Sequence, residues 1–233
     1  MRRGLLVTGT DTEVGKTVVT ASVVAALHAR GITVQPLKPV ESGTDDVGGT
    51  PHDASLLARC ANVALSTTNV LALPEPLAPT VAAERAGVPL TIEPMDAAIA
   101  AVPDETTLVV EGVGGALVEV VRGVMVADLP VRWGLPVLVV AANRLGVLSH
   151  TLLTVEALRS RGADVRAVVL NTVSSEPPSI AQRTNEVELR HLLPEGVPVH
   201  TFPWLPAQER EEPSSLARAA DVAFGDRVLA WTR

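Results

Sequence analysis

The chain has 233 residues, 47% of them apolar, with two Phe, three Trp and no Tyr, so it can build one large α/β domain or two small ones around a mostly aliphatic core. The net charge is −7 and the Arg residues form no basic stripe, which argues against a nucleic-acid partner. No apolar run approaches the ~18–20 residues of a membrane span, and the N-terminal run is too short for a secretory signal, so the sequence predicts a soluble, cytoplasmic protein with no membrane partner.

Apolar runs of strand length alternate with segments of helix length. The run at 4–9 is followed by a helix from Lys16 to about Arg30, and a shorter helix at 52–61 holds the single cysteine, Cys60, expected to be a buried, inert thiol. Further strands are expected at 32–38, 106–112, 135–142, 165–171 and 197–203, and further helices at 149–161 and about 178–192.

This alternation predicts one α/β domain over residues 1–233, with a doubly wound, mostly parallel sheet and right-handed crossovers. Residues 39–105 are the least regular part, because ESGTDDVGGTP and LALPEPLAPT are typical of loops, and they are expected to form an irregular insertion. Ligands of doubly wound sheets bind beyond the carboxyl ends of the strands. The polar segments after successive strands are therefore expected to share one rim of the sheet. They are GTDTEVGKT, KPVESG, EGVGG, NRLG, NT and PWLP.

The first of these segments, residues 9–17, matches a phosphate-binding loop (P-loop) with one residue too many: five residues, not four, separate Gly9 from Gly15. Gly9 allows a sharp turn and Gly15 a close approach to phosphate, while Lys16 supplies a positive charge and Thr17 a hydroxyl for Mg²⁺. A strand-to-helix turn with a chance GKT is the alternative, but its position directly after a buried strand favours a nucleotide site. Glu13 is unusual there, because a carboxylate repels phosphate unless it faces a metal ion or an amine.

Five segments, spread in order over residues 5–205, resemble the dethiobiotin synthetases, whose P-loop has the same extra residue. These segments are VTGTDTEVGKT, KPVESG, EGVGG, LGVLSH and PWL. The resemblance implies a P-loop NTPase-like three-layer sandwich, ATP as co-substrate, Mg²⁺ as cofactor, and a homodimer with active sites at the subunit interface. It also implies the reaction of 7,8-diaminopelargonate with CO₂ and ATP, in which a carbamate becomes a carbamic–phosphoric anhydride and ring closure releases phosphate.

The resemblance assigns catalytic roles to four residues. Lys16 would bind the β- and γ-phosphates, Lys38 would bridge the carbamate and the transferred phosphoryl group, and Thr12 and Glu13 would face the substrate. A solvated lysine at a strand end is the alternative for Lys38.

The resemblance gives Mg²⁺ three oxygen ligands, Thr17, Asp53 and Glu111. On position alone, Asp53 suits an N-cap of the helix at 52–61 equally well. Asp45 and Asp46 are expected to be solvated loop residues and reserve ligands, and His52 is discounted because no second His has suitable spacing.

The remaining contacts are likewise implied by the resemblance. Trp204 has surface packing as its alternative, and Val113 and Ser149 stand where the family more often has Ala and Asn. His150 is expected to be structural, while backbone N–H groups at 145–147 suit the substrate carboxylate. The expected substrate contacts are Thr12, Ser42, Leu145, Gly146 and Ser149. The expected ATP contacts are Glu13, Val14, Gly15, Lys16, Thr17, Val18, Asp53, Glu111, Gly112, Val113, Gly114, Asn171, Thr172, Pro203, Trp204 and Leu205.

Three other functions remain to be weighed. A partitioning-type switch ATPase carries a second lysine near the start of its P-loop, and GTDTE has none. A regulatory relative without chemistry is disfavoured because the chain retains five residues together: Lys16, Thr17, Lys38, Asp53 and Glu111. A kinase acting on another small amine or acid is excluded only by the resemblance.

Overall fold

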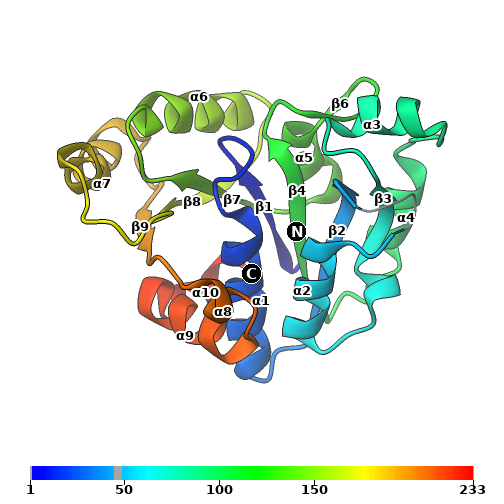
Figure 1. Ribbon diagram of the computed structural model, residues 1–233, viewed down its shortest axis with the longest axis horizontal. Coiled ribbons are helices and arrows are strands. Elements are labelled where there is room, and N and C mark those ends of the chain that lie inside the picture. Colours follow the sequence, from blue (N-terminus) through cyan, green and yellow to red (C-terminus); the bar gives the residue numbers. More distant parts are fainter. Residues whose placement is uncertain (1, 45–48, 233) are drawn as a thin grey trace.

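The computed structural model of the chain describes residues 2–44 and 49–232. At its centre lies a seven-stranded sheet in the order β3-β2-β4-β1-β7-β8-β9, with every neighbouring pair parallel (Figure 1). The strands are β1 (Gly4–Gly9), β2 (Val34–Ser42), β3 (Asn69–Leu73), β4 (Thr107–Gly115), β7 (Val137–Ala142), β8 (Val165–Asn171) and β9 (Val199–Phe202). After β4, the short strands β5 (Glu119–Val121) and β6 (Val124–Met125) form a separate antiparallel pair.

Helices cover both faces of the sheet, so the fold is the expected three-layer α/β sandwich. One core cluster joins the sheet to α1 (Lys16–Ala29), α2 (His52–Ala61), α9 (Pro213–Phe224) and α10 (Arg227–Trp231). The other joins it to α3 (Pro79–Ala86), α4 (Glu93–Ala100), α5 (Leu129–Trp133), α6 (Val147–Arg159) and α7 (Ile180–Leu192). The short elements are η1 (Leu65–Thr67), η2 (Val126–Asp128) and α8 (Ala207–Arg210).

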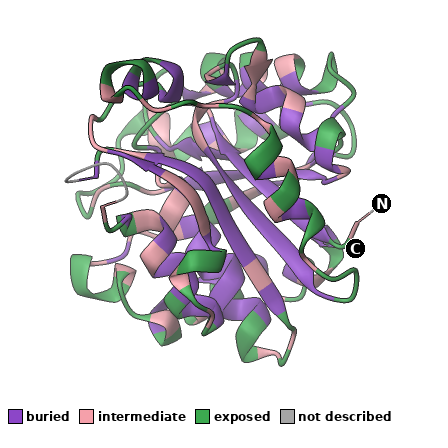
Figure 2. Ribbon diagram, turned by 90° about the vertical axis from the view of Figure 1, so that its right-hand side faces the viewer, coloured by how far each residue is buried: buried purple, intermediate pink, exposed green. Residues whose placement is uncertain are grey.

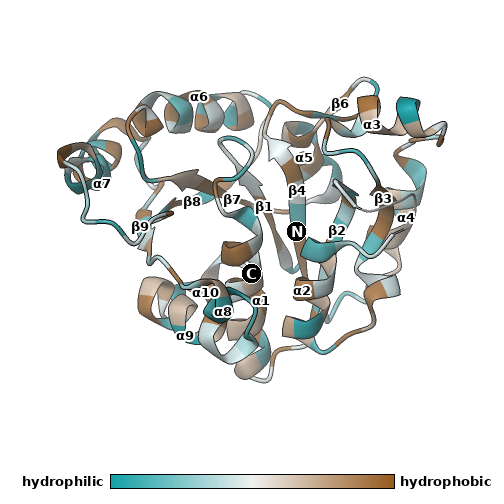
Figure 3. Ribbon diagram, viewed as in Figure 1, coloured by the Kyte–Doolittle hydropathy of each residue, from teal (hydrophilic) through white to brown (hydrophobic). Residues whose placement is uncertain are grey.

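The strands are apolar because both of their faces are covered. Every residue of β1 and β7 is buried, and Figure 2 shows the strands as an almost continuous buried layer. Parallel strands in this environment read as continuous aliphatic runs rather than alternating ones. Figure 3 accordingly marks many sheet residues as hydrophobic. Aromatic side chains contribute mainly at one end of the sheet, where Phe202 stacks on Phe224 at 5.7 Å and Trp231 packs against that ring.

The six predicted strands and the predicted helices are present, but two strands are longer than expected. β2 continues to Ser42 and β4 to Gly115, so Lys38 and Glu111 lie inside strands rather than at their ends. The segment EGVGG and all of KPVESG except its final Gly43 are therefore strand residues and not loops.

The prediction of an irregular insertion over residues 39–105 was wrong. That range contains the end of β2, the edge strand β3, and the helices α2, α3 and α4. β3 was missed because its NVLAL run is short and is followed by three prolines within seven residues, which reads as loop. Asp45 and Asp46, the reserve metal ligands, lie outside the described residues. No helix in the described ranges combines the length and apolar composition that crossing a membrane requires.

Candidate active site

The P-loop connects the central strand β1 to helix α1. Gly15 is the N-cap of α1 with φ 89°, and no side chain caps this helix, so the first backbone N–H groups of α1 face the loop without an intrahelical partner. Such a helix start binds anions, because the N–H groups and the helix dipole both favour negative charge. A Cβ atom at Gly15 would lie 2.1 Å from Nδ2 of Asn171, so both the backbone angle and the neighbouring side chain require glycine.

Two hydrogen bonds shape the loop. Lys16 Nζ donates to the carbonyl oxygen of Asp11 at 2.8 Å, and Asn171 Nδ2 donates to the carbonyl oxygen of Val14 at 2.9 Å. Burial, together with the nearby Lys38 ammonium, lowers the pKa of Lys16 to about 8. The predicted phosphate-binding lysine and one of the predicted ATP contacts, Asn171, therefore both lie against the same loop.

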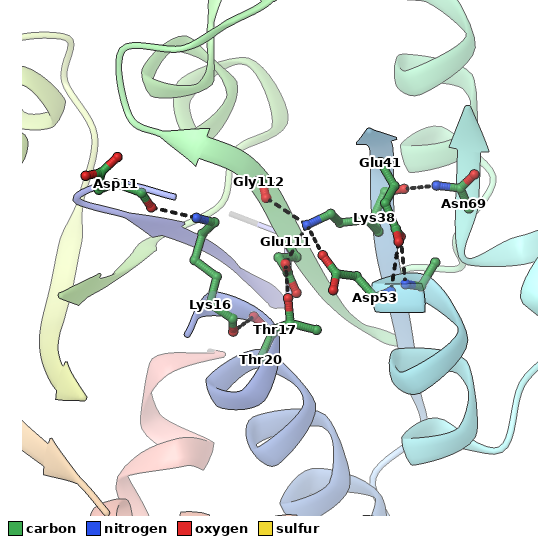
Figure 4. Close-up of polar contacts among 11 residues, drawn as sticks. Asp11, Lys16, Thr17, Thr20, Lys38, Glu41, Asp53, Asn69, Glu111 and Gly112 are labelled. Atoms are coloured by element: carbon green, nitrogen blue, oxygen red, sulfur yellow. Dashed lines mark hydrogen bonds and ion pairs between the residues drawn. The ribbon is translucent and has the colours of Figure 1, made fainter. Parts of the chain in front are cut away.

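A second lysine, Lys38 on β2, is the centre of a buried charge cluster (Figure 4). Its Nζ atom lies 2.5 Å from Oε1 of Glu111 on β4 and 2.9 Å from Oδ2 of Asp53 on α2, and it donates to the carbonyl of Gly112 at 3.3 Å. The hydroxyl of Thr17 donates to the same Glu111 oxygen at 2.9 Å. Four predicted site residues from four elements thus meet next to the start of α1, although two of them lie within strands and not in the expected loops.

The N-cap interpretation of Asp53 was wrong. The N-cap of α2 is Pro51, and Asp53 lies in the first turn of the helix with its carboxylate directed at Lys38. The alternative interpretation of Lys38, a solvated lysine at a strand end, was also wrong, because this residue is only 3% exposed.

The charges of this cluster depend on one another. Burial disfavours a charged Lys38, but the Glu111 and Asp53 carboxylates outweigh it and hold the lysine pKa above its ordinary value. Burial raises the pKa of Glu111. For Asp53 burial acts in the same direction, yet the Lys38 ammonium outweighs it and lowers the carboxyl pKa. The two carboxylates therefore favour the protonated form of Lys38 and both contact its ammonium group.

The oxygen atoms of this cluster fit a magnesium ion. Oε2 of Glu111 is buried and has no hydrogen-bond partner among the described residues, so one carboxylate oxygen is free to bind a cation. Thr17 and Asp53 add hard oxygen donors. In the described part of the chain no three His, Cys, Asp or Glu side chains form a metal-binding group.

A cleft of about 320 Å³ lies beside the P-loop, between the end of β4 and helix α6. Its polar lining includes Asp11 and His150, and its apolar lining includes Leu117 and Leu153. His150 is exposed at the cleft wall, and its predicted structural role stays a prediction. The cleft is open to solvent and largely apolar, as a site for an aliphatic molecule requires.

The remaining predicted residues surround the loop. Thr12 and Glu13 are exposed at its tip, and Glu13 has a left-handed backbone with φ 55°. Ser42 ends β2, four residues after Lys38. Gly146, with φ 92°, is the N-cap of α6, which has no side-chain cap, and the neighbouring Leu145 is 86% exposed. Ser149 is exposed in the first turn of α6.

The predicted wall of the nucleotide site follows β9. Trp204 is half-buried, and the Arg210 guanidinium lies 5.8 Å from its ring centroid, while Leu205 is buried in the core. Thr172 is tied to this segment, because its N–H donates to the carbonyl of Phe202 at 3.0 Å.

Two polar residues near this site were missed from the sequence. Glu41, within KPVESG, accepts hydrogen bonds from the start of α2. Arg144 of the NRLG segment lies 3.7 Å from Asp11 of the P-loop. The position directly after β7 is the signal for Arg144, whereas the sequence gives no comparable signal for Glu41 within the polar segment KPVES.

The fold and this site define a class of protein. A lysine-bearing loop between the central strand and a helix of a doubly wound sheet, with an acid from the neighbouring strand, is the nucleotide site of a P-loop NTPase. A family model described as an AAA domain matches residues 3–211. Among solved structures, the cell division ATPase MinD of Pyrococcus furiosus has 20% identity and a TM-score of 0.54, covering 94% of this chain and 95% of that one. A ParA family ATPase of Chlorobium tepidum has 14% identity and a TM-score of 0.57, covering 100% and 99%. At these identities the likeness shows the fold alone.

Similar sequences define the family within that class. The ATP-dependent dethiobiotin synthetase BioD of Anaeromyxobacter dehalogenans is 39% identical over 208 residues, which cover 88% of this chain and 91% of that protein. The protein of the same name in Mycobacteroides abscessus is 43% identical, and the match covers 82% of this chain and 87% of that protein. The one in Rhodococcus erythropolis is 36% identical, and the match covers 94% of each chain. The chain therefore belongs to the dethiobiotin synthetase family.

Proposed function

We propose that this chain is an ATP-dependent dethiobiotin synthetase that acts in biotin biosynthesis. The substrates are 7,8-diaminopelargonate, CO₂ and ATP, and the products are the cyclic urea dethiobiotin, ADP and phosphate. The observation that carries the proposal is the buried Lys38, held between Glu111 and Asp53 beside the lysine-bearing P-loop. Since ATP and CO₂ are the co-substrates, we also expect the enzyme to work in the cytoplasm.

The chemistry explains why two lysines are needed. The carbamate of diaminopelargonate and the triphosphate of ATP are both anionic, so their approach requires fixed positive charge. In the proposed reaction Lys16 binds the β- and γ-phosphates, and Lys38 contacts the carbamate oxygen and the γ-phosphoryl group. The carbamate oxygen attacks phosphorus, ADP leaves, and the second amine then attacks the carbonyl carbon and expels phosphate.

Mg²⁺ is part of the proposal. Thr17, Asp53 and Glu111 would hold it, and the ion when bound would neutralise charge on the β- and γ-phosphates. The free Oε2 atom of Glu111 supports this assignment, because a buried carboxylate oxygen without a partner is costly unless a cation or donor occupies it.

The exposed tip of the P-loop is assigned to the amine substrate. Thr12 and Glu13 project from the extra-length loop, where a carboxylate suits a diamine better than a phosphate. The carboxylate tail of the substrate would bind the uncapped start of α6 at Leu145 and Gly146, with Ser149 close by. Ser42 would contact the carbamate.

We propose a homodimer with active sites at the interface. Leu117, Leu145 and Leu153 are 58%, 86% and 62% exposed, and two of them line the cleft beside the P-loop. A patch of this kind is typical of a surface that a second subunit covers. The partner subunit would then close the cleft and contribute the carboxylate contacts at the start of α6.

The likeness to MinD and ParA structures makes a partitioning-type ATPase the main alternative. The loop segment GTDTE lacks the second lysine of that class. A nucleotide switch also gives no reason for Lys38 to be buried between two carboxylates. The relatives named as dethiobiotin synthetases favour the synthetase, and the same relatives disfavour a kinase acting on another amine.

The test is phosphate release with bicarbonate, 7,8-diaminopelargonate and MgATP, with the organic product identified by mass. Turnover that requires the diamine and yields the cyclic urea is expected. ATP hydrolysis that continues without the diamine and gives no cyclic urea would contradict the proposal.

A further inference from the structure

Glu41 is a buried carboxylate beside the charge cluster that has no contact with either lysine. It lies on β2 and is 6% exposed. Its Oε1 atom accepts a hydrogen bond from the backbone N–H of Asp53 at 2.9 Å, and its Oε2 atom accepts one from the N–H of Ala54 at 3.0 Å. Figure 4 shows this carboxylate facing the start of α2 while the Asp53 side chain points to Lys38.

Glu41 does for α2 what an N-cap side chain does for other helices. The first N–H groups of a helix have no intrahelical partner, and the N-cap Pro51 offers no side-chain acceptor. A carboxylate satisfies these donors and is favoured there by the helix dipole. Because this one comes from a strand twelve residues earlier, it fixes the helix to the sheet and not only to its own preceding turn.

The strand brings Glu41 to the same side as Lys38. Residues three apart on a regular strand face opposite sides. Here Leu37 and Val40 belong to one core cluster although they are three positions apart, so the two faces do not alternate strictly between them. Lys38 and Glu41 consequently both contact α2.

We infer that Glu41 is a positioning residue that sets the direction of the Asp53 carboxylate, and this inference rests on the proposed role of Asp53 in holding Mg²⁺ with ATP. The Asp53 side chain is 36% exposed, so packing alone does not fix it. Its backbone N–H is held directly by Glu41, and its carboxylate is thereby aimed at Lys38 and the Thr17 side of the P-loop. Partners of metal-binding side chains in other proteins change metal affinity by about 10–100-fold when they are removed.

The experiment measures the affinity for ATP with Mg²⁺ and with EDTA, by calorimetry and without turnover. The dissociation constant in EDTA divided by that with Mg²⁺ is the Mg²⁺ ratio, and it reports how much the metal contributes to ATP binding. We expect Glu41→Ala to reduce this ratio by about 10-fold or more. Glu41→Gln keeps the size of the side chain and one acceptor oxygen, so it is expected to lie between the wild type and Glu41→Ala, and it serves as the test if Glu41→Ala does not fold.

Ser179→Ala is the matched control. Ser179 caps α7 by accepting from the N–H of Gln182, far along the chain from the P-loop, so its loss removes a helix cap without touching α2. It is expected to lower Tm and to leave the Mg²⁺ ratio at the wild-type value.

The outcomes separate the two hypotheses. A wild-type protein whose ATP affinity does not depend on Mg²⁺ contradicts the proposed metal site itself. A normal wild-type ratio that both Glu41 variants retain overturns the positioning role. A Glu41→Ala variant that loses affinity equally with and without Mg²⁺ also overturns it, because Glu41 would then support only the fold.

Discussion

The ammonium of Lys38 lies 2.5 Å from Oε1 of Glu111, and the two side chains are 4% and 0% exposed. Two such charges stay buried only because they compensate one another, and removing one partner of a buried ion pair costs about 3–5 kcal/mol. Lys38 therefore has two effects: it is the cation proposed for catalysis, and it stabilises the folded protein by compensating the buried charge of Glu111.

Replacing Lys38 by Met is expected to lower turnover by at least ~10², the loss of one preorganised charge. ATP binding should change little, since Lys16 and the P-loop are intact. Phosphate release under saturating substrates gives the turnover, and calorimetry gives the affinity. Turnover within a few-fold of the wild type would remove Lys38 from the mechanism.

Lys38→Met also leaves Glu111 buried without its cation, so Tm is expected to fall. The double variant Lys38→Met/Glu111→Gln removes the unpaired charge and should recover most of that Tm without recovering turnover. Recovery of both would mean that Lys38 acts only on stability.

Replacing Gly15 by Ala is expected to abolish nucleotide binding. A Cβ atom there would lie 2.1 Å from Nδ2 of Asn171, which itself donates to the P-loop carbonyl of Val14. Gly31→Ala is the control, because Gly31 has a similar φ of +74° but nothing within 4 Å of the added carbon. Both variants carry the backbone strain of roughly 1–2 kcal/mol, and only Gly15→Ala should lose ATP in a binding titration. Equal binding by the two variants would contradict the steric argument.

The affinity for ATP is expected to fall as the pH rises through about 8, where Lys16 loses its proton in the free protein. The pKa of Lys16 is lowered relative to ~10.4 in the unfolded chain. Between these values the unfolded state binds more protons, so the contribution of Lys16 to the free energy of unfolding rises with pH while ATP binding weakens. Direct titrations with ATP measure the dissociation constant as a function of pH. They cover roughly pH 6.5 to 9.5, on both sides of the lowered Lys16 pKa. Lys16→Arg stays charged throughout, so a loss of affinity at high pH in that variant would assign the titration elsewhere.

Replacing Leu153 by Glu is expected to shift the protein from dimer to monomer and to lower turnover, because Leu153 is 62% exposed on α6 beside the cleft. Val222→Glu is the control, since Val222 is 82% exposed on α9, which covers the opposite face of the sheet. Sedimentation velocity gives the oligomeric state of both. A dimer that survives Leu153→Glu would move the interface away from α6.

The sequence predicts most of the fold because its strands are buried on both faces. Runs such as LPVLVVAA need no tertiary information to be recognised, and β7 was expected at 135–142 and found at Val137–Ala142. The edge strand β3 was missed for the opposite reason: only two of its five residues are buried, so its pattern is weak.

The site divides in the same way. The GKT of the P-loop identifies Lys16 and Thr17 because that loop is contiguous. Glu41 could not be found by pattern, because a regular strand would turn it away from Lys38, and the departure from strict alternation between Leu37 and Val40 is visible only in the folded chain.

The sequence by itself determined the α/β class, the P-loop and, through its resemblance, the family, since these depend on runs and spacings within short segments. Only the tertiary structure decided which partners each charge has: that Asp53 faces Lys38 rather than capping its helix, that Glu41 caps it instead, and that Lys38 is buried. The physical reason is that a charge is stabilised by whatever surrounds it in three dimensions, and these neighbours come from β2, α2, β4 and α1, which are as many as 94 residues apart in the chain.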